Sequence, residues 1–349
     1  MSLSRVQREE IKKSLLEDLG DSDGSLDVSA FAKSRGVSGQ TIYRYLRELE
    51  AKGQIVQKKI GNKSLYLLKD HVEFFNLKLA GLDEEVVWKS SIRPLLEKLP
   101  DNAFKICNYV FTEMLNNAIE HSAGSQIQIL VSDNGFRVQI VVADDGVGIF
   151  TKISEAMGLT EKSFAILELA KGKFTTDPSS HTGEGVFFSS KAADSFSISA
   201  DGLLFFPLNN DPDADSGVSD FTRRIFMSGT TVLFEVKYNN ENTLRELFDK
   251  YTNSPEDYGF TKTVVPVRLL EFGDDNAMFV SRSQAKRLLV RFERFELIEL
   301  DFTDVEEIGQ GFADEIFRVF PSNHPNSKIV AINAAPQVSQ MIAHVTAFL

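Results

Sequence analysis

The clearest pattern of apolar and polar positions lies in the middle of the chain. Apolar residues recur there at helical spacing, which predicts an amphipathic helix with Glu113, Asn117 and Glu120 on its other faces. The apolar positions are Phe111, Met114, Leu115, Ala118 and Ile119. About one strand later, an apolar run at 141–143 leads directly into a turn with two glycines. That second pattern predicts a buried strand that ends in a tight turn.

The N-terminal pattern is typical of a winged helix-turn-helix. A first helix is expected at about 7–18, and two further helical patterns flank a turn at Gly36. Ser38 is the expected N-cap of the later helix, because serine there satisfies a free backbone N–H. Its inward residues are Ile42, Leu46 and Leu49. Residues 54–67 then alternate like a hairpin that turns near Gly61-Asn62.

The outward positions of this segment carry residue types that contact bases and phosphates. They are Gln40, Thr41, Tyr43, Arg44 and Arg47 on the helix, and Lys58, Lys59 and Lys63 on the hairpin. We expect the helix to enter a major groove of DNA and the hairpin to touch phosphates. The alternative is a protein-contact domain whose basic residues are simply solvated.

The C-terminal pattern alternates between strands and helices. Strands are expected at 277–280, 297–302 and 328–332. Helices are expected at 284–294, at 312–320 and from Pro336 onwards. Such alternation predicts a parallel-rich sheet packed with helices.

Length and charge agree with several domains. A chain of 349 residues exceeds a typical single domain. The formal net charge is −12, yet residues 1–70 hold 13 Lys or Arg against 10 Asp or Glu. The acidic remainder would repel nucleic acid, whereas the N-terminal segment is able to approach it. We expect an α+β multidomain protein with domains at 1–70, 82–240 and 258–349.

Composition also bears on the compartment. The single cysteine, Cys107, cannot form an intrachain disulfide, and its apolar surroundings predict a buried structural thiol. No apolar segment approaches the length of a membrane span, and the N-terminus lacks a secretory signal. We therefore expect a cytoplasmic protein. Residues 209–220 are polar and acidic enough to form a loop between strands.

Four motifs in order resemble the nucleotide site of the GHKL, or Bergerat-fold, ATPases, the superfamily of gyrase B, MutL, sensor histidine kinases and anti-sigma-factor kinases. They are TEMLNNAIEHS at 112–122, VVADDGVGI at 141–149, HTGEGVFFSSKAAD at 181–194 and SGTTVLFEV at 228–236. The resemblance implies a Bergerat-fold α/β sandwich that binds ATP with Mg²⁺. The four motifs are informative because they occur together; each motif alone is weak evidence for a nucleotide site.

The first two motifs then imply roles for individual residues. Asn117 would hold the magnesium ion that bridges the phosphates. Glu113, one helical turn earlier on the same face, would be the general base of a hydrolysing member. Asp144 would accept a hydrogen bond from the adenine amino group, and its neighbour Asp145 is interpreted as an exposed turn residue. The turn glycines are Gly146 and Gly148.

The last two motifs imply the phosphate end and a support for the aspartate. Gly183 and Gly185 lie at the expected start of a helix, where free N–H groups and the helix dipole favour phosphate oxygens. Thr230 would reach back to the adenine-binding aspartate, directly or through water. Among the ionisable neighbours, Lys171 and Lys173 are candidates to reach a γ-phosphate, with plain solvation as the alternative.

The segment from Gly148 to His181 is expected to be a lid. His121 and His181 border the pocket motifs, but neither has the companions that a metal site needs, and we expect His181 to position the lid. A histidine kinase is disfavoured, since no helix before the pocket carries a phosphoacceptor histidine. His71 lies instead just after the hairpin.

The piece LIELDFTDVEEIGQGFADEIFRVF resembles STAS domains, best known as anti-sigma-factor antagonists, and more closely a STAS-like domain of bacterial proteins. Phosphorylatable antagonists carry a serine before the helix-opening glycine. Here Gly309-Gln310-Gly311 places no hydroxyl at that position, so the fused ATPase cannot phosphorylate this loop at the usual position. An interaction or regulatory role is the preferred interpretation, and a structural role is the alternative.

Three functions from different classes follow. The first is a nucleotide-controlled, DNA-binding transcription regulator that acts as a homodimer and contacts a protein partner through the STAS-like domain. The second is an anti-sigma-type protein serine/threonine kinase that acts on a separate STAS-like partner. The third is an ATP-hydrolysing machine of the gyrase or MutL type, which the absence of a recognisable transducer domain disfavours.

Overall fold

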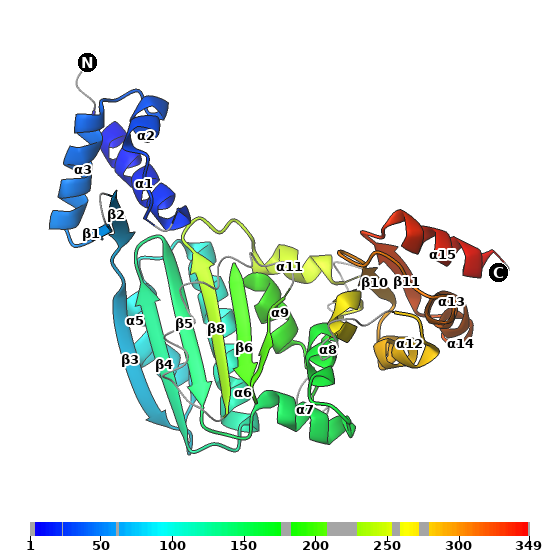
Figure 1. Ribbon diagram of the computed structural model, residues 1–349. Coiled ribbons are helices and arrows are strands. Elements are labelled where there is room, and N and C mark those ends of the chain that lie inside the picture. Colours follow the sequence, from blue (N-terminus) through cyan, green and yellow to red (C-terminus); the bar gives the residue numbers. More distant parts are fainter. Residues whose placement is uncertain are drawn as a thin grey trace.

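The chain folds into three parts that follow one another in sequence (Figure 1). The computed structural model describes residues 4–22, 24–60, 63–175, 183–207, 229–252, 259–271 and 279–347. The loop expected at 209–220, the hairpin turn at 61–62 and His181 lie outside these residues. Within the described residues, no helix combines the length and the apolar character that a membrane span requires. The mixed α and β multidomain architecture predicted from the sequence is present.

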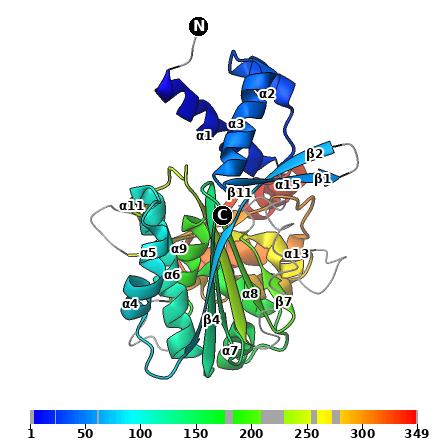
Figure 2. The same ribbon diagram turned by 90° about the vertical axis from the view of Figure 1, so that its left-hand side faces the viewer.

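The N-terminal part contains the helices and the hairpin that the sequence predicted. Its elements are α1 (Arg5–Asp21), α2 (Val28–Ser34), α3 (Gly39–Ala51), β1 (Ile55–Ile60) and β2 (Lys63–Leu68). The two strands pair antiparallel. Ser38 caps α3 by accepting a hydrogen bond from the N–H of Thr41. The inward residues of α3 are buried in a core that belongs to this part alone. Figure 2 shows the hairpin projecting beside α3.

A short connection joins this part to the central sheet. Only Lys69 and Asp70 separate β2 from β3 (His71–Lys78), and β3 pairs with the sheet along its whole length. The sheet therefore begins before the boundary expected at residue 82. The sequence did not predict β3, because each of its two faces carries both apolar and polar residues, so no clear alternation marks it. Phe75 packs on the core, whereas Phe74 on the other face is 52% exposed.

The described strands of the central part form an antiparallel sheet in the order β3-β4-β5-β8-β6-β7. Its further strands are β4 (Gln126–Asp133), β5 (Arg137–Asp144), β6 (Ser195–Ala200), β7 (Leu203–Phe205) and β8 (Thr230–Lys237). Its helical elements are α4 (Glu84–Val87), the π-helical turn η1 (Trp88–Ile92), α5 (Arg93–Leu96), α6 (Asp101–His121), α7 (Ile149–Met157), α8 (Phe164–Lys171), α9 (Gly185–Ala192) and α11 (Leu244–Lys250). Pro94 lies at the start of α5, where the π-helical turn η1 passes into α-helix.

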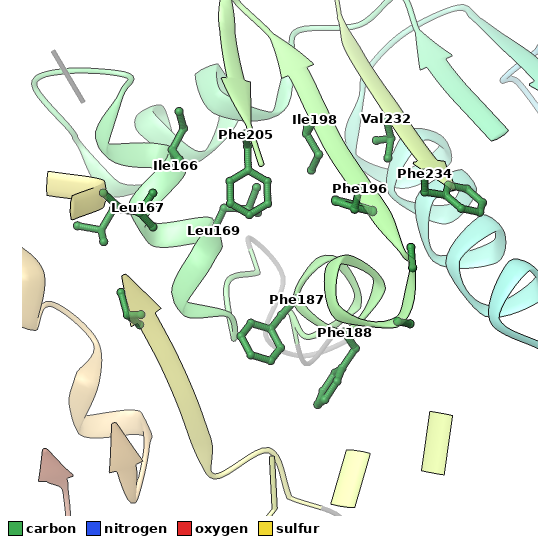
Figure 3. Close-up of a cluster of buried hydrophobic side chains, with 14 of the residues drawn as sticks. Ile166, Leu167, Leu169, Phe187, Phe188, Phe196, Ile198, Phe205, Val232 and Phe234 are labelled. Atoms are coloured by element: carbon green, nitrogen blue, oxygen red, sulfur yellow. The ribbon is translucent and has the colours of Figure 1, made fainter. Parts of the chain in front are cut away.

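The central helix α6 packs on β5 and β8, and α9 packs on β6. Figure 2 shows α4, α5 and α6 together on one face of the sheet. Cys107 of α6 is fully buried, and burial raises the pKa of its thiol, so the predicted structural role is confirmed. In Figure 3 side chains from the strands, such as Ile198 and Phe205, point towards α8 and α9.

The C-terminal part has a parallel sheet in the order β11-β10-β9 within the described residues, as the alternating pattern predicted. Its elements are β9 (Lys262–Pro266), the 3-10 turn η3 (Val267–Glu271), α12 (Arg282–Leu289), the 3-10 turn η4 (Phe292–Arg294), β10 (Leu297–Asp301), α13 (Gln310–Asp314), the π-helical turn η5 (Glu315–Val319), α14 (Phe320–Asn323), β11 (Lys328–Ile332) and α15 (Pro336–Thr346).

Two expectations for this part were wrong. The helix expected at 284–294 ends at Leu289, because Val290 leaves helical geometry with ψ 127°, and Arg291 then adopts a left-handed conformation with φ +67°. The strand β9 was not predicted, and residues 279–280 of the strand expected at 277–280 are not in a strand. Residues 277–278 lie outside the described residues.

One hydrophobic core runs through the central and C-terminal parts without a break. Its junction is aromatic: the ring centroid of Phe260, just before β9, lies 4.6 Å from that of Phe187 and 5.0 Å from that of Phe188 on α9. Both α9 residues are visible in Figure 3. Burying rings of this size contributes a large share of the stabilisation of any core. The two parts therefore stabilise each other, while the N-terminal part has its own core.

Candidate nucleotide site

A cavity of about 330 Å³ lies among α6, β5, α7, α9 and β8. A volume of this size suits a small organic ligand. The structure brings together residues from all four sequence motifs in its wall. These are Glu113, Asn117, Asp144, Gly148, Gly183, Gly185 and Thr230. Gly146 is not in the wall, but it shapes the turn beside it.

Two candidate residues project from α6, because Glu113 and Asn117 lie one helical turn apart and both reach the cavity. The carboxylate of Glu113 also approaches the start of α9. A Cβ placed on Gly185 would lie only 2.0 Å from Glu113 Oε2, so the lack of a side chain permits this approach. The predicted general base thus lies beside the predicted phosphate loop.

Asp144 ends β5 and is only 4% exposed. Its Oδ1 accepts hydrogen bonds from the N–H of Gly146 at 2.9 Å and from the N–H of Thr230 at 3.3 Å. Burial nevertheless raises the pKa of the Asp144 carboxyl. Within the described residues no donor reaches Oδ2, and Asp144 lines the cavity. This oxygen can accept a hydrogen bond from an amino group of a ligand.

The turn after Asp144 packs against the end of α6. A Cβ on Gly146 would lie 2.1 Å from the carbonyl oxygen of Ser122, so a side chain cannot replace this glycine without moving backbone. The same carbonyl accepts a hydrogen bond from the N–H of Val147 at 2.9 Å. The turn and the helix that carries Asn117 are therefore held as one piece.

Asp145 differs from the expectation of an exposed turn residue. It is half-buried, and its Oδ1 accepts from the N–H groups of Ser125 at 2.6 Å and Gln126 at 2.9 Å. Its Oδ2 accepts from the hydroxyl of Ser125 at 2.7 Å. The hydrogen bond from Gln126 is the largest cause that lowers the pKa of Asp145. Two adjacent carboxyls thus have opposite environments: Asp144 faces the cavity, and Asp145 anchors the start of β4.

Thr230 connects β8 to both sides of the turn. Its N–H donates to Asp144, and its hydroxyl oxygen accepts from the N–H of Ile149 at 2.9 Å. The resemblance implied that a threonine here reaches back to the aspartate. In this chain the direct contact with Asp144 comes from the backbone, and the side chain holds the first turn of α7.

Lys152 is a cavity residue that the sequence reasoning missed. Among the described residues it is the one lysine or arginine in the cavity wall. Its Nζ donates to the carbonyl oxygen of His121 at 2.6 Å, one turn beyond Asn117 on α6. An ammonium group at that place can neutralise an anionic ligand. Its position in the first turn after the Gly146–Gly148 motif was the available signal.

Lys171 and Lys173 do not line the cavity, so the hypothesis that they reach a γ-phosphate is wrong. Lys171 is fully buried, and its Nζ bonds to Glu168 and to the carbonyl oxygen of Val290 at 3.0 Å. Lys173 Nζ donates to the carbonyl oxygen of Arg294 at 2.9 Å. Both side chains instead attach α8 and the residues after it to the C-terminal part.

The donor set fits a magnesium ion that keeps phosphates and waters as ligands. Within the described residues, no group of three or more His, Cys, Asp or Glu is placed to hold a metal ion. Asn117 offers one amide oxygen in the cavity wall. Mg²⁺ is commonly bound in this way, through one or two protein oxygens and the substrate phosphates.

The candidate DNA-contacting residues gather on the other side of the molecule. Tyr43, Arg44 and Arg47 of α3 are exposed, as is Gln40, whereas Thr41 is half-buried. Lys58 and Lys59 of β1 are exposed as well, while the side chain of Lys63 lies outside the described residues. A groove between α3 and the hairpin contains all five α3 residues together with Glu50 and Gln57.

Comparison with known proteins agrees with these motifs. A family model described as histidine kinase-, DNA gyrase B-, and HSP90-like ATPase matches residues 104–239. A second model, described as a STAS-like domain of unknown function, matches residues 284–339. A comparison with curated proteins gave no match. The chain therefore contains an ATP-binding domain of the GHKL superfamily at 104–239, followed by a STAS-like domain at 284–339.

Proposed function

We propose that the chain is a transcription regulator whose DNA binding is controlled by ATP and Mg²⁺. The observation that carries this proposal is that one strand connects the cavity to the part with the candidate DNA-contacting residues. β5 ends at Asp144 in the cavity wall, and Phe136, just before its other end, lies against Gly20 of α1. Eight residues of extended strand span roughly 24 Å, so the cavity and the N-terminal part are distant from each other but are joined by a strand inside the sheet.

The nucleotide is bound from both ends of the cavity in this proposal. Asp144 accepts a hydrogen bond from the adenine amino group, and the start of α9 at Gly183 and Gly185 binds phosphate oxygens through free N–H groups. Asn117 holds the magnesium ion, which neutralises and bridges the phosphates. Lys152 adds a positive charge on the same side as Asn117.

Contacts at the far end of the sheet support the transmission of a conformational change from the nucleotide site to the N-terminal part. A Cβ on Gly20 of α1 would lie 2.3 Å from the ring of Phe136, which shows how closely α1 meets the turn before β5. Asp21 of α1 forms an ion pair with Lys237 at the end of β8, at 3.4 Å. A change in the conformation of the sheet would therefore alter the packing of α1. Control by ATP additionally requires that the two arrangements bind ATP with different affinity.

DNA binding rests on the outward residues of α3 and the hairpin. Arg44 and Arg47 project from α3 as phosphate- and base-contacting residues do in other major-groove helices. The small excess of positive charge on residues 1–70 favours a homodimer, because two copies double the phosphate contacts. The protein partner of the STAS-like domain belongs to the same proposal.

The test is to select genomic DNA fragments with the full-length protein and to measure their binding with and without ATP and Mg²⁺. We expect ATP to change the DNA affinity, and the double variant Arg44→Ala, Arg47→Ala to weaken it. Lys13→Ala is the matched control, since Lys13 lies on α1 and is 77% exposed. DNA affinity that is the same in both variants and insensitive to ATP would contradict the proposal.

A protein serine/threonine kinase is the second candidate, favoured by the position of Glu113 beside the start of α9. Its substrate would be a separate STAS-like protein. The corresponding loop here, Gly309-Gln310-Gly311, carries no hydroxyl; the N–H of Gly309 donates to the carbonyl oxygen of Phe279, and its Cβ site is 2.7 Å from Val280 Cα. Labelled ATP separates the candidates: stable label on protein indicates a kinase, released phosphate an ATPase of the gyrase or MutL type, and retained nucleotide with altered DNA affinity the regulator.

A further inference from the structure

A buried charge network connects α8 of the ATPase domain to the STAS-like domain. The side chains of Lys171, Glu168 and Arg291 are 0%, 4% and 10% exposed. Arg291 Nη1 donates to Glu168 Oε2 at 3.0 Å, and Lys171 Nζ bonds to the other carboxylate oxygen. Buried charges are tolerated only when their geometry and hydrogen bonds are well satisfied. The network therefore fixes how the two domains meet. Figure 1 shows α8 between the central sheet and the C-terminal part.

Arg291 also holds the backbone that follows α8. Its Nη2 donates to the carbonyl oxygen of Gly172 at 3.0 Å and to that of Lys173. The guanidinium carbon lies 5.3 Å from the centroid of the Phe174 ring. A guanidinium suits this task because its planar fork donates in several directions at once. One side chain thus contacts three consecutive residues of the other domain.

The backbone of Arg291 is in a region that residues other than glycine rarely adopt, with φ +67°. Such conformations persist when surrounding contacts hold them, and they are concentrated at functional positions. Here the conformation ends α12 and coincides with the contacts to Glu168, Gly172 and Lys173. Arg291 itself does not line the cavity.

The held segment leads directly to the phosphate end of the cavity. Phe174 lines the cavity, and a Cβ on Gly183 would lie 2.4 Å from the backbone carbon and oxygen of Phe174. Gly183 has φ +73°, so it rests on Phe174 in a way that a residue with a side chain could not. Gly183 and Gly185 then lead into α9. The adenine end, by contrast, is built by Asp144 and Thr230 on β5 and β8.

We propose that Arg291 of the STAS-like domain is a positioning residue for the phosphate-binding end of the ATPase site. This inference rests on the proposed function, because it takes ATP as the ligand. Docking of the STAS-like domain sets the position of residues 172–174, and these set the start of the phosphate loop at Gly183. By linkage, bound ATP stabilises the docking of the STAS-like domain by the same factor.

The test compares two ligands in the full-length protein. In Arg291→Ala we expect the affinity for ATP with Mg²⁺ to fall by roughly 5- to 150-fold, the usual range for coupling between sites. The affinity for adenosine, measured by competition against a labelled nucleotide, should stay unchanged, because adenosine uses the Asp144 end. Equal weakening of both ligands would indicate a merely structural role and overturn the proposal, as would unchanged ATP affinity.

Two further variants keep the test decisive. Arg268→Ala removes a half-exposed arginine of the C-terminal part that pairs with Asp304 at 2.6 Å, and it should leave ATP affinity unchanged. Arg291→Lys retains a cation next to Glu168 and so protects the fold, but a single ammonium cannot replace all the contacts of the fork. It should show a smaller loss of ATP affinity with adenosine binding intact.

Hydrogen exchange supplies the reciprocal readout. ATP should slow exchange at the amides of residues 290–294 in the wild-type protein, and this protection should be lost in Arg291→Ala. A wild-type protein that binds ATP without any protection there contradicts the inference alone. A wild-type protein that does not bind ATP removes the proposed function itself, so the two failures are distinguishable.

Discussion

Thr230 donates its backbone N–H to Asp144 Oδ1 at 3.3 Å, while its hydroxyl accepts from the N–H of Ile149 at 2.9 Å. The wall of the proposed adenine end is therefore assembled from protein hydrogen bonds before any ligand arrives. Preorganisation of this kind lowers the cost of binding, since few groups have to be ordered by the nucleotide.

Asp144→Asn should weaken ATP binding while it keeps the hydrogen bonds that hold the turn. The amide oxygen of asparagine can still accept from Gly146 and Thr230, but an amide nitrogen would face the adenine amino group as a second donor. We expect ATP affinity to fall by roughly 5- to 150-fold, since an unpaired buried donor costs about 1–3 kcal/mol. Calorimetric titration measures the affinity, and unchanged ATP binding would refute the assignment of the adenine end.

The same variant should have a higher free energy of unfolding at pH 7. Burial raises the pKa of Asp144, so ionisation in the folded state costs stability, and this cost appears as pH rises from the ordinary pKa of 3.8 to the raised one. The stability gain of Asp144→Asn should therefore grow over that interval and then level off. Asp145→Asn is the matched control: its pKa is lowered, so the loss of charge should destabilise the fold.

Glu113→Gln should preserve nucleotide binding and remove turnover. The amide keeps the shape of the side chain beside Gly185 but cannot take up a proton. If the protein hydrolyses or transfers the terminal phosphate, the rate should fall by about 10²- to 10⁴-fold, as for other general bases. Phosphate release and ATP titration are measured on the same sample. Turnover at the wild-type rate would exclude Glu113 as the base.

Lys152→Met should weaken ATP more than adenosine. The ammonium group lies in the cavity wall, and a hydrogen bond to a charged group is worth about 1.5–3 kcal/mol, or roughly 10- to 150-fold in affinity. Lys162→Met is a suitable control, because Lys162 pairs with Asp201 at 3.6 Å and is not in the wall. Equal losses for ATP and adenosine would show that Lys152 does not act on phosphate.

Lys191→Met should raise stability at pH 7 in a pH-dependent way. Burial is the main cause that lowers the pKa of Lys191 from 10.5 to about 8. A lowered folded-state pKa means that protonation costs stability below pH 8, by about 1–3 kcal/mol, and that this cost disappears as pH rises towards 10.5. The gain in melting temperature should shrink over the same interval. Lys98→Met is the control, because Lys98 is exposed, and it should show no such trend.

The sequence predicted the parts of the site that depend on local spacing. Glu113 and Asn117 share a helical face, and Asp144 follows a buried strand directly; the resemblance to the GHKL ATPases placed all three in one site, and they lie in one wall. The predicted N-cap at Ser38 was correct for the same reason. Each of these features is decided within a few residues of chain.

The features that were missed depend on contacts between distant segments. Lys171 looks like a solvated loop residue until Val290 and Glu168 are seen around it. Nothing near Arg291 in sequence indicates that it turns back to α8, because its partners lie more than a hundred residues earlier. Burial of a charge is a property of the assembled domains, and it overrides the local preference of lysine and arginine for solvent.

The shared core of the central and C-terminal parts has a consequence for how this chain is able to diversify. A recombination event at Lys69-Asp70 exchanges the N-terminal part while crossing few contacts, among them the pair of Asp21 with Lys237. A crossover between β8 and β9 instead divides the aromatic cluster around Phe260. The ATPase domain and the STAS-like domain are therefore inherited together, whereas the N-terminal part can be exchanged.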